Sequence, residues 1–272
     1  MPSAPSGIIT AFLAEGSLPL SRSVSRVQAM LNRADYDAAD LAEHLRMDST
    51  LAAKVMGVAN SAFFSRQPCS SIDDAVNRLG TAQLRRIFAQ VLAGAALITP
   101  LQAYGLVGDA NWRRSVYTAV GSELAARHNG EDGSGSYMIG LLHQIGQVVV
   151  NALWQKSGRT TPLVRVNFEQ EFSADEMTLC GSDQAALGAE LLRQLSFPED
   201  VYRIVGRQYR PALEPAAQVL YLGRLAREFI CAGPGTAVNS DVLQNFNLTS
   251  TSQLEAFVAD VREESQNRIQ GG

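Results

Sequence analysis

Tyr137-Met-Ile-Gly-Leu-Leu-His-Gln-Ile-Gly-Gln-Val-Val-Val150 is the stretch that decides the fold of this chain of 272 residues. Its apolar residues run through to the β-branched end at Val148–Val150, so we expect one buried helix here. His143 lies inside this helix, and a buried imidazole is costly unless it is hydrogen-bonded. Residue type alone leaves two interpretations open, a satisfied core histidine, which is the commoner case, and a functional histidine.

The rest of the chain is also helical in pattern. Apolar residues recur at intervals of three and four, as Leu84, Ile87, Phe88 and Val91 do, and such a stripe is typical of a helix face packed on a core. Outside the run already quoted, only residues 163–168 resemble a strand. We therefore expect an all-α fold.

Four short stretches place a serine three residues before an acidic residue, as a helix capping box requires. There the hydroxyl accepts from a backbone N–H of the first turn, and the acid reaches back to the cap. The four stretches are Ser71–Asp74, Ser173–Glu176, Ser196–Glu199 and Ser252–Glu255. Each predicts the beginning of a helix.

Charge and composition exclude several classes of function. The chain has 23 basic and 27 acidic residues and a formal charge of −4, so it has no bulk attraction to nucleic acid or to an anionic membrane. Its 3 cysteines are far apart and form no CxxC pair, which supports neither a disulfide framework nor a cysteine zinc site. No stretch approaches the roughly 18 apolar residues of a membrane span, and the N-terminus lacks a basic signal region. We expect a cytoplasmic protein with no membrane partner and no direct nucleic-acid partner.

Several motifs carry a resemblance. Gly140–Gly146 (GLLHQIG) resembles the GLLHDIG motif of the HD superfamily, whose His-Asp pair binds a divalent metal that activates water. Asp48–Ala62 (DSTLAAKVMGVANSA) is similar to a segment specific to the HD-related output domain (HDOD) family. Ile72–Gly80 and Gly188–Pro198 resemble two further segments of that family. The matches follow the family's order over about residues 18 to 210, which implies a two-lobed, HD-like helical domain.

Breaks along the chain suggest its organisation. Gly105–Asp109 interrupts the chain after a long helix, and Arg210–Pro215 contains two prolines, which are typical of a joint between elements. We expect an N-terminal segment at 1–17 and an HDOD domain at 18–213, with lobes at about 18–100 and 110–213. A C-terminal helical extension is expected at 214–272.

Five motif residues are expected to have structural roles. Asn60 and Ser61 can end a helix and cap the next turn, because asparagine tolerates left-handed geometry and serine bonds locally. A contact with a ligand is the alternative for this pair. The five residues are Asn60, Ser61, Gly80, Gly140 and Gly146.

The resemblance implies a metal site whose ligands this sequence has lost. The aspartate of the His-Asp pair is replaced by Gln144, and two later histidine positions are occupied by Gln184 and Gln208. The tryptophan segment Trp112–Val116 also lacks a histidine. Neutral amides compensate poorly for the water that a cation gives up. We expect no metal, no cofactor and no catalytic residue.

The position that holds the metal in HD enzymes could bind an anion in this chain. If the family fold holds, six polar side chains meet there, namely Arg113, Arg114, His143, Gln144, Gln184 and Gln208. Guanidinium groups could replace the charge of the metal and bind an anion or a phosphate bidentately. The alternative is a plugged core in which these groups satisfy one another.

Three functions remain open. The resemblance favours a non-catalytic regulatory module of bacterial signal transduction that acts through protein–protein interaction with other signalling proteins. The second is a nucleotide- or phosphate-binding sensor that takes an anionic small ligand in the degenerate cleft. The third, a metal-dependent phosphohydrolase with a rebuilt site, requires ligands that the sequence does not supply.

Overall fold

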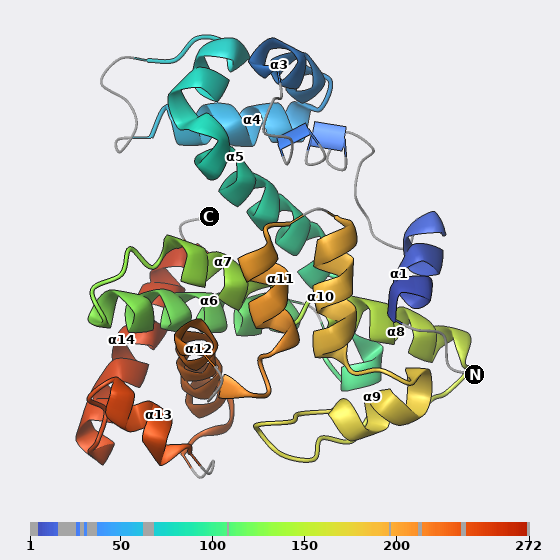
Figure 1. The fold of residues 1–272 in the computed structure, drawn as a ribbon, viewed down its shortest axis with the longest axis vertical. Coiled ribbons are helices and arrows are strands. Elements are labelled where there is room, and N and C mark those ends of the chain that lie inside the picture. The colour runs from blue at the N-terminus through green and yellow to red at the C-terminus, as the bar shows by residue number, and fades with distance from the viewer. Residues whose placement is uncertain are drawn as a thin grey trace.

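The computed structural model describes residues 5–15, 26–27, 30–31, 37–61, 68–107, 109–195, 197–211, 214–234 and 238–270. All long elements in these ranges are helices (Figure 1). In the same ranges extended backbone pairs only at two isolated bridges, Leu101–Leu106 and Asn167–Glu171. The prediction of an all-α fold is confirmed, and the strand-like run at 163–168 is a loop. None of the described helices combines the length and the apolar character that a bilayer span requires.

The first lobe stands at the top of Figure 1. It consists of α3 (Ala38–Arg46), α4 (Ser49–Ala59) and the first part of α5 (Ile72–Leu97). Their apolar faces form a core of their own that includes Leu41, Val55 and Phe88. Because burial of such side chains stabilises by about 1.5–3 kcal/mol each, this small core can hold three short helices together.

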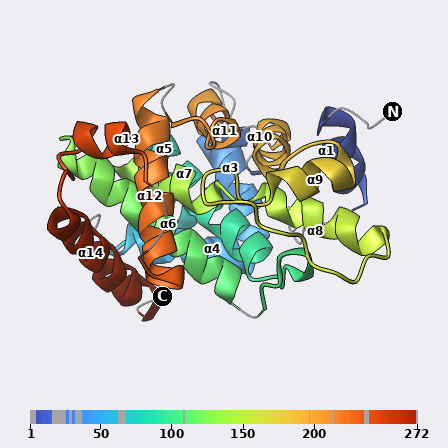
Figure 2. The same cartoon turned by 90° about the horizontal axis from the view of Figure 1, so that it is seen from below.

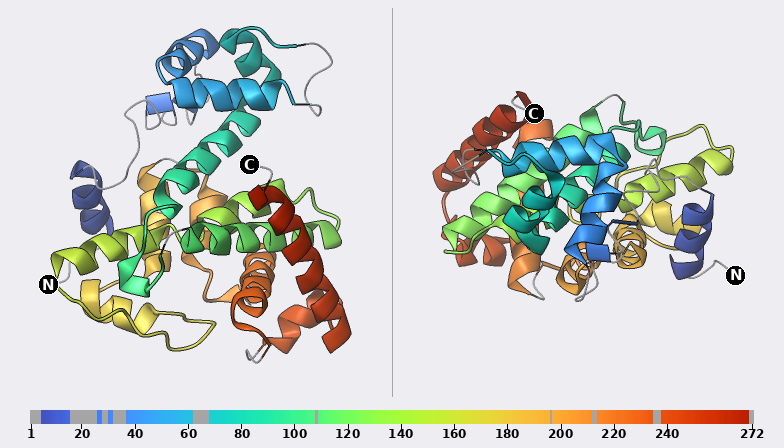
Figure 3. Two further views of the ribbon diagram at one scale, coloured as in Figure 1. Left: turned by 180° about the vertical axis from the view of Figure 1, so that it is seen from behind. Right: turned by 90° about the horizontal axis from the view of Figure 1, so that it is seen from above.

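Helix α5 joins the two lobes and is broken at Gly80. This residue has φ 68° and ψ 172°, so two helical segments meet there at a kink. A residue with a Cβ is strained at such a positive φ, which explains why the motif has glycine at this position. Below the kink the helix descends into the second lobe, as the view from behind shows (Figure 3), and its end at Leu97 lies in that lobe's core.

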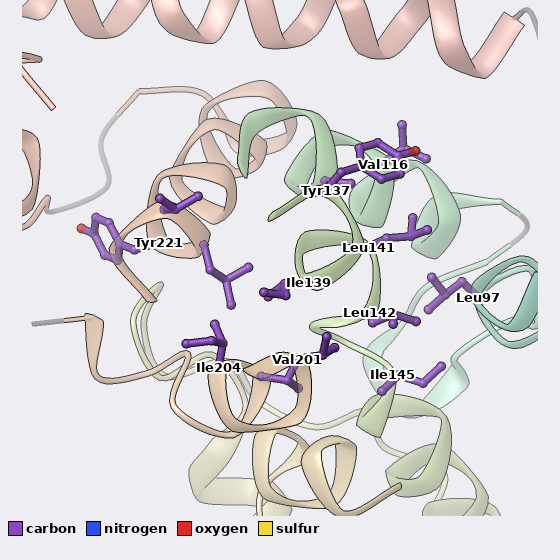
Figure 4. Packing of buried hydrophobic residues seen from close by; sticks show 14 of the residues in the cluster. Leu97, Val116, Tyr137, Ile139, Leu141, Leu142, Ile145, Val201, Ile204 and Tyr221 are labelled. Carbon is purple, nitrogen blue, oxygen red and sulfur yellow. The ribbon is translucent and has the colours of Figure 1, made fainter. Parts of the chain in front are cut away.

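The second lobe is larger and surrounds α6. Its elements are η1 (Gln102–Tyr104), α6 (Ala110–His128), α7 (Ser134–Leu142), α8 (Gly146–Lys156), α9 (Ser173–Cys180), α10 (Gln184–Gln194) and α11 (Glu199–Gly206). Apolar side chains of α6, α7 and α11 meet in its core, among them Val116, Ile139 and Val201 (Figure 4).

The two chain ends belong to this second lobe. Helix α1 (Pro5–Ala14) packs on α10. The C-terminal extension forms α12 (Pro215–Ala232), α13 (Ser240–Asn245) and α14 (Thr251–Gln270), and α12 lies against α6 and α7 with α14 beside it (Figure 2). Gly121 of α6 and Gly223 of α12 make this contact close, since a Cβ added at Gly223 would stand 2.3 Å from the Ser122 hydroxyl.

The stretch that decides the fold differs from the single helix we expected. It is divided between α7 and α8, with His143 and Gln144 in the turn between them. The two helices share the core with Ile145 of the turn, and His143 and Gln144 are themselves buried, so no exposed residue marks the turn. A continuous apolar run does not show where a buried helix bends.

The capping predictions meet mixed outcomes. Ser71 caps α5 as expected, because its hydroxyl accepts from the amide of Asp74 at 3.1 Å. Ser196 lies outside the described residues, and α9 has no side-chain cap. For α14 the capping box is Ser250 with Gln253, two residues earlier than predicted. The side-chain oxygen of Gln253 accepts from the backbone N–H of Ser250 at 3.0 Å, and the Ser250 hydroxyl accepts from the backbone N–H of Gln253 at 3.2 Å.

Candidate functional site

Two glycines allow the turn between α7 and α8 to approach its neighbours. A Cβ at Gly140 would stand 2.7 Å from the Cα of Ala119 on α6, and one at Gly146 would stand 2.0 Å from the carbonyl oxygen of Gln184 on α10. Real Cβ atoms do not come so close to backbone atoms. These contacts hold His143 and Gln144 between α6, α10 and α12.

His143 is fully buried and its protonation state follows from its partners. Its Nδ1 lies 2.6 Å from the carbonyl oxygen of Gly140. A carbonyl can only accept, so Nδ1 carries the hydrogen, and the lone pair of Nε2 accepts from Nη1 of Arg227 at 3.1 Å. Burial and the charge of Arg227 hold the pKa of His143 well below its usual range. The imidazole is neutral, and its unprotonated nitrogen accepts a hydrogen bond from the cation Arg227.

Glu171 supplies the negative charge of the site. Its Oε1 accepts from Nη2 of Arg227 at 2.6 Å and from Nη2 of Arg224 at 3.3 Å, and its Oε2 accepts from the Gln144 amide at 3.3 Å. Burial raises the pKa of Glu171, but the charges of Arg227 and Arg224 outweigh burial and hold this pKa far below its usual range. We call His143, Glu171, Arg224 and Arg227 the buried charge cluster.

The loop that brings Glu171 to the cluster runs from residue 163 to residue 172, and we call it the strap. In Figure 1 it extends between α8 and α9 toward α12. Glu171 has φ 48°, which is rare for a residue with a side chain, and a short internal turn stabilises it, with the Glu171 amide donating to the Asn167 carbonyl at 2.7 Å. The buried side chains of Leu163 and Phe168 anchor the strap.

Arg224 connects the strap with the end of α11. Its Nη1 donates to the carbonyl of Gln208 at 2.7 Å, and its Nη2 donates to the carbonyl of Phe168 at 2.9 Å. The guanidinium also lies over the rings of Phe168 and Tyr209, with its carbon 5.2 Å and 4.9 Å from their centroids. Such cation–π contacts stabilise a desolvated guanidinium.

The three glutamines are brought to the same region and are buried. Gln144 donates to Glu171, Gln184 donates to the Tyr209 hydroxyl at 2.9 Å, and Gln208 donates to the carbonyls of His143 and Val205 at 2.9 Å each. In the described part of the chain, the side-chain oxygen of each glutamine has no donor. The three amides thus bond other groups rather than one another, and each leaves one acceptor.

The expectation that both Arg113 and Arg114 would reach this site is wrong for Arg113. Its guanidinium points outward and pairs with Asp109 at 2.7 Å, with the side chain 52% exposed. Arg114 is half-buried, and burial together with the charge of Arg227 lowers its pKa. A one-residue step on a helix turns a side chain by about 100°, so neighbouring arginines cannot share one target.

The motif residues of the first lobe lie away from the cluster. Asn60 follows the last residue of α4 and clamps the backbone of Cys69, accepting from its amide at 2.6 Å and donating to its carbonyl at 3.1 Å. The Ser61 hydroxyl donates to the carbonyl of Val58 at 2.8 Å. These contacts fix the chain as it leaves α4.

Sequence reasoning missed Glu171, Arg224 and Arg227, the residues that dominate the site. Arg224 and Arg227 are three residues apart in a mostly apolar helix, and both are fully buried. Charged residues on the apolar face of a helix were the available signal, because arginine is rarely buried unless it is paired. Glu171 had no comparable signal in the sequence.

Another buried carboxyl, Glu176, lies beside the site, and no cation of the described residues pairs with it. Its Oε1 accepts from the Tyr104 hydroxyl and its Oε2 accepts from the backbone N–H of Gln184, both at 2.7 Å. Burial raises the pKa of Glu176 to about 7, although these two hydrogen bonds lower it, and the charges of Glu171 and Asp183 add to the rise. The folded protein therefore holds this proton to higher pH than the unfolded chain.

The stability of the protein should depend on this proton. Between the unfolded pKa and about 7 the folded state binds more protons than the unfolded state, so stability falls as pH rises and levels off above that range. Glu176→Gln cannot ionise, and its amide can still bond Tyr104 and Gln184. From pH 5 to pH 8 we expect wild type to lose roughly 2 kcal/mol relative to this variant in urea unfolding. Glu169→Gln, exposed on the strap, is the control, and a difference that is constant with pH would contradict the assignment.

The residues present do not suit the divalent metal that the HD resemblance implies. A catalytic cation needs several imidazole or anionic ligands at close range. Here the free nitrogen of His143 accepts from Arg227, and the carboxylate of Glu171 is bonded by two guanidiniums. Among the described residues, no group of three or more His, Cys, Asp or Glu side chains could hold an ion.

Comparison with known proteins matches most of the chain to one family. The family model of the HDOD domain matches residues 18–211. A candidate phosphohydrolase from Shewanella amazonensis shares 19% identity and a TM-score of 0.59, with 94% of this chain and 93% of that chain covered. For an HDOD domain protein of unknown function from Geobacter sulfurreducens the values are 21%, 0.53, 97% and 95%. At these identities the likeness shows the fold.

Two further relatives are longer than this chain. A candidate signal transduction protein from Marinobacter aquaeolei shares 21% identity and a TM-score of 0.59, with 93% of this chain and 58% of that chain covered. An uncharacterised protein of Treponema pallidum is 22% identical over 249 residues, which are 86% of this chain and 47% of that protein. The chain thus spans about half the length of the curated relative it matches. Arg224 and Arg227 lie outside the segment that the family model matches.

Proposed function

The chain belongs to the HDOD family, whose model matches residues 18–211, and from this premise we propose that it is a non-catalytic module of bacterial signal transduction that acts through protein–protein interaction. Its partners would be other signalling proteins of the cytoplasm. It needs no metal and no cofactor for this role.

One observation carries the non-catalytic part of the proposal. At the position where HD enzymes bind their metal through a histidine, the nitrogen of His143 accepts a hydrogen bond from Arg227. Since a metal ion and a guanidinium cannot share one lone pair, binding of metal would require breaking this bond and leaving Arg227 without a partner for Nη1. The neutral amides of the nearby glutamines would be weak ligands and would not compensate for this loss.

The regulatory part of the proposal is supported by the family and by the nature of the domain. One solved structure of similar fold is a candidate signal transduction protein, whereas another is a candidate phosphohydrolase, so the fold alone does not choose between the two roles. The charge cluster supports the regulatory role, because Arg227 occupies the nitrogen of His143 that a metal would need. The outward position of Arg113 removes one of the two arginines that the alternative function, a nucleotide- or phosphate-binding sensor, could use, whereas Arg114 lies near the site.

We expect the purified protein to carry no stoichiometric transition metal. The measurement is elemental analysis after dialysis, followed by assays with added Mn²⁺ or Fe²⁺ on nucleotide phosphates and cyclic dinucleotides. No hydrolysis above that of His143→Ala should appear. About one or two metal ions per chain, or hydrolysis that His143→Ala abolishes, would overturn the non-catalytic proposal.

The interaction itself is tested by capture followed by reconstitution. The full chain is used to capture binding proteins from its source organism, and each candidate is then purified and mixed with it. We expect at least one signalling protein to form a complex of defined stoichiometry from the two purified components. If no captured protein binds in the purified mixture, the interaction proposal is wrong.

A further inference from the structure

The buried charge cluster contains more positive than negative charge. Arg224 and Arg227 are both fully buried, and Glu171 is the carboxylate that pairs with both of them. Arg114 adds a third guanidinium near Arg227, as the effect of Arg227 on its pKa shows. Buried cations are costly unless each is paired. Glu228 is a second buried carboxylate near Arg114 and Arg227, but it bonds Arg165 at 2.6 Å, so two carboxylates serve four arginines.

The same arginines have hydrogen-bond donors to spare. In the described part of the chain, the Nε atoms of Arg114, Arg224 and Arg227 are buried and have no acceptor. A carboxylate offers two oxygens and one charge, whereas a phosphoryl group offers three oxygens and up to two charges. Arginine pairs bind phosphoryl groups bidentately through such donors.

The carboxylate that now occupies these arginines belongs to the strap, a surface loop held by the buried side chains of Leu163 and Phe168 and by an ion pair between Arg165 and Glu228. Five of its ten residues are exposed, including Val164 at 65% and Val166 at 54%. Glu171 has an unfavourable positive φ, which the surrounding contacts must maintain. Release of Glu171 would relieve this strain and would remove an acceptor from Nη2 of Arg224 and from Nη2 of Arg227.

We propose that Arg224 and Arg227 form a binding site for a phosphoryl group, and that Glu171 of the strap is its built-in competitor. Because Arg224 also bonds the Phe168 carbonyl, binding of the ligand loosens the strap at two points. The exposed strap would then change its conformation with occupancy of the site. This inference concerns a ligand and holds whether or not the protein acts through a partner.

The test compares Glu171→Gly with Glu169→Gly. Glycine at 171 removes the carboxylate and tolerates the positive φ, and the control removes an equal charge from an exposed residue of the same loop. Thermal unfolding is followed in chloride, acetate and inorganic phosphate at one ionic strength and at pH 7.5. Glu171→Gly should melt below wild type in chloride. Phosphate should raise its Tm saturably, by roughly 5 °C at a hundredfold excess over Kd.

The other arms show whether the competitor and the ligand are correctly assigned. Wild type and Glu169→Gly should need at least tenfold more phosphate for half of their response, because Glu171 competes, and acetate should be a weaker ligand than phosphate. Equal rescue of Glu171→Gly by acetate would overturn the phosphoryl assignment. Absence of a saturable phosphate response in Glu171→Gly would overturn the site.

A second measurement serves if Glu171→Gly does not fold. Hydrogen exchange of wild type reports the strap directly, since the amides of Val166 and Glu171 donate within it. Saturating phosphate should speed exchange of these two amides at least several-fold, while chloride at the same ionic strength should not. Unchanged exchange in phosphate would contradict the proposal.

Discussion

Arg227→Met should lower the free energy of unfolding by about 3–5 kcal/mol, the cost of removing one partner from a buried ion pair. The substitution keeps an unbranched side chain of similar length but removes the 2.6 Å bond to Glu171 and the 3.1 Å bond to His143. Glu171 then retains only Arg224 as a charged partner. Urea unfolding at neutral pH gives the value.

Two variants make this prediction specific. Arg113→Met removes an arginine from the same region, but one that is exposed and paired with exposed Asp109, so no measurable change in the free energy of unfolding is expected. The double variant Arg227→Met, Glu171→Gln removes both members of this ion pair and should cost less than the sum of the single variants. Additive effects would mean that the two charges are not coupled, which would contradict the cluster.

Gly146→Ala should cost about 3 kcal/mol or more, because a new Cβ has no room. It would stand 2.0 Å from the carbonyl oxygen of Gln184 and 2.6 Å from the amide nitrogen of Gly188. Both are backbone atoms of α10, so relief requires a shift of the whole helix and overpacking energies apply. Thermal or urea unfolding measures the loss.

Gly57→Ala is the matched control for this substitution. Gly57 lies within α4, and a Cβ there would meet nothing within 4 Å. Alanine favours helix over glycine by up to about 1 kcal/mol, so this variant should be slightly more stable than wild type. If both alanines had the same small effect, the close contact between α8 and α10 would be absent in solution.

The fold was predictable because its determinants are local. The spacing of Leu84, Ile87 and Phe88 predicts a helix, and these residues are buried in the core of the first lobe. The division of the quoted stretch into α7 and α8 was not predictable in this way. Apolar residues continue on both sides of the turn. The bend depends on contacts of Gly140 and Gly146 with other helices.

The site was predictable only where a motif marked it. The family motif pointed to His143 and the three glutamines, and all four are buried in one region. Their decisive partners come from elsewhere, Glu171 from a loop and Arg227 from a helix beyond the matched domain. Pairing between such distant residues depends on tertiary packing, which neither periodicity nor local spacing reports.

The error at Arg113 arises because successive side chains of a helix point in different directions. Both Arg113 and Arg114 follow Trp112, and the sequence offers no reason to separate them. In the structure α6 presents Arg114 toward α12, whereas Arg113 forms an i,i+4 pair with Asp109 at the surface. Without the position of α12, the buried face of α6 at this point could not be assigned.

The ¹⁵N spectrum of the imidazole rings tests the central claim most directly, because the chain has only 3 histidines and His44→Gln and His128→Gln assign them. The claim is that Arg227 occupies the nitrogen of His143 that a metal would need. It predicts a neutral ring with the hydrogen on Nδ1, unchanged from pH 8 to pH 5 and unaffected by added Mn²⁺. A His143 ring that titrates in the ordinary histidine range, or whose signal broadens on addition of Mn²⁺, would contradict it.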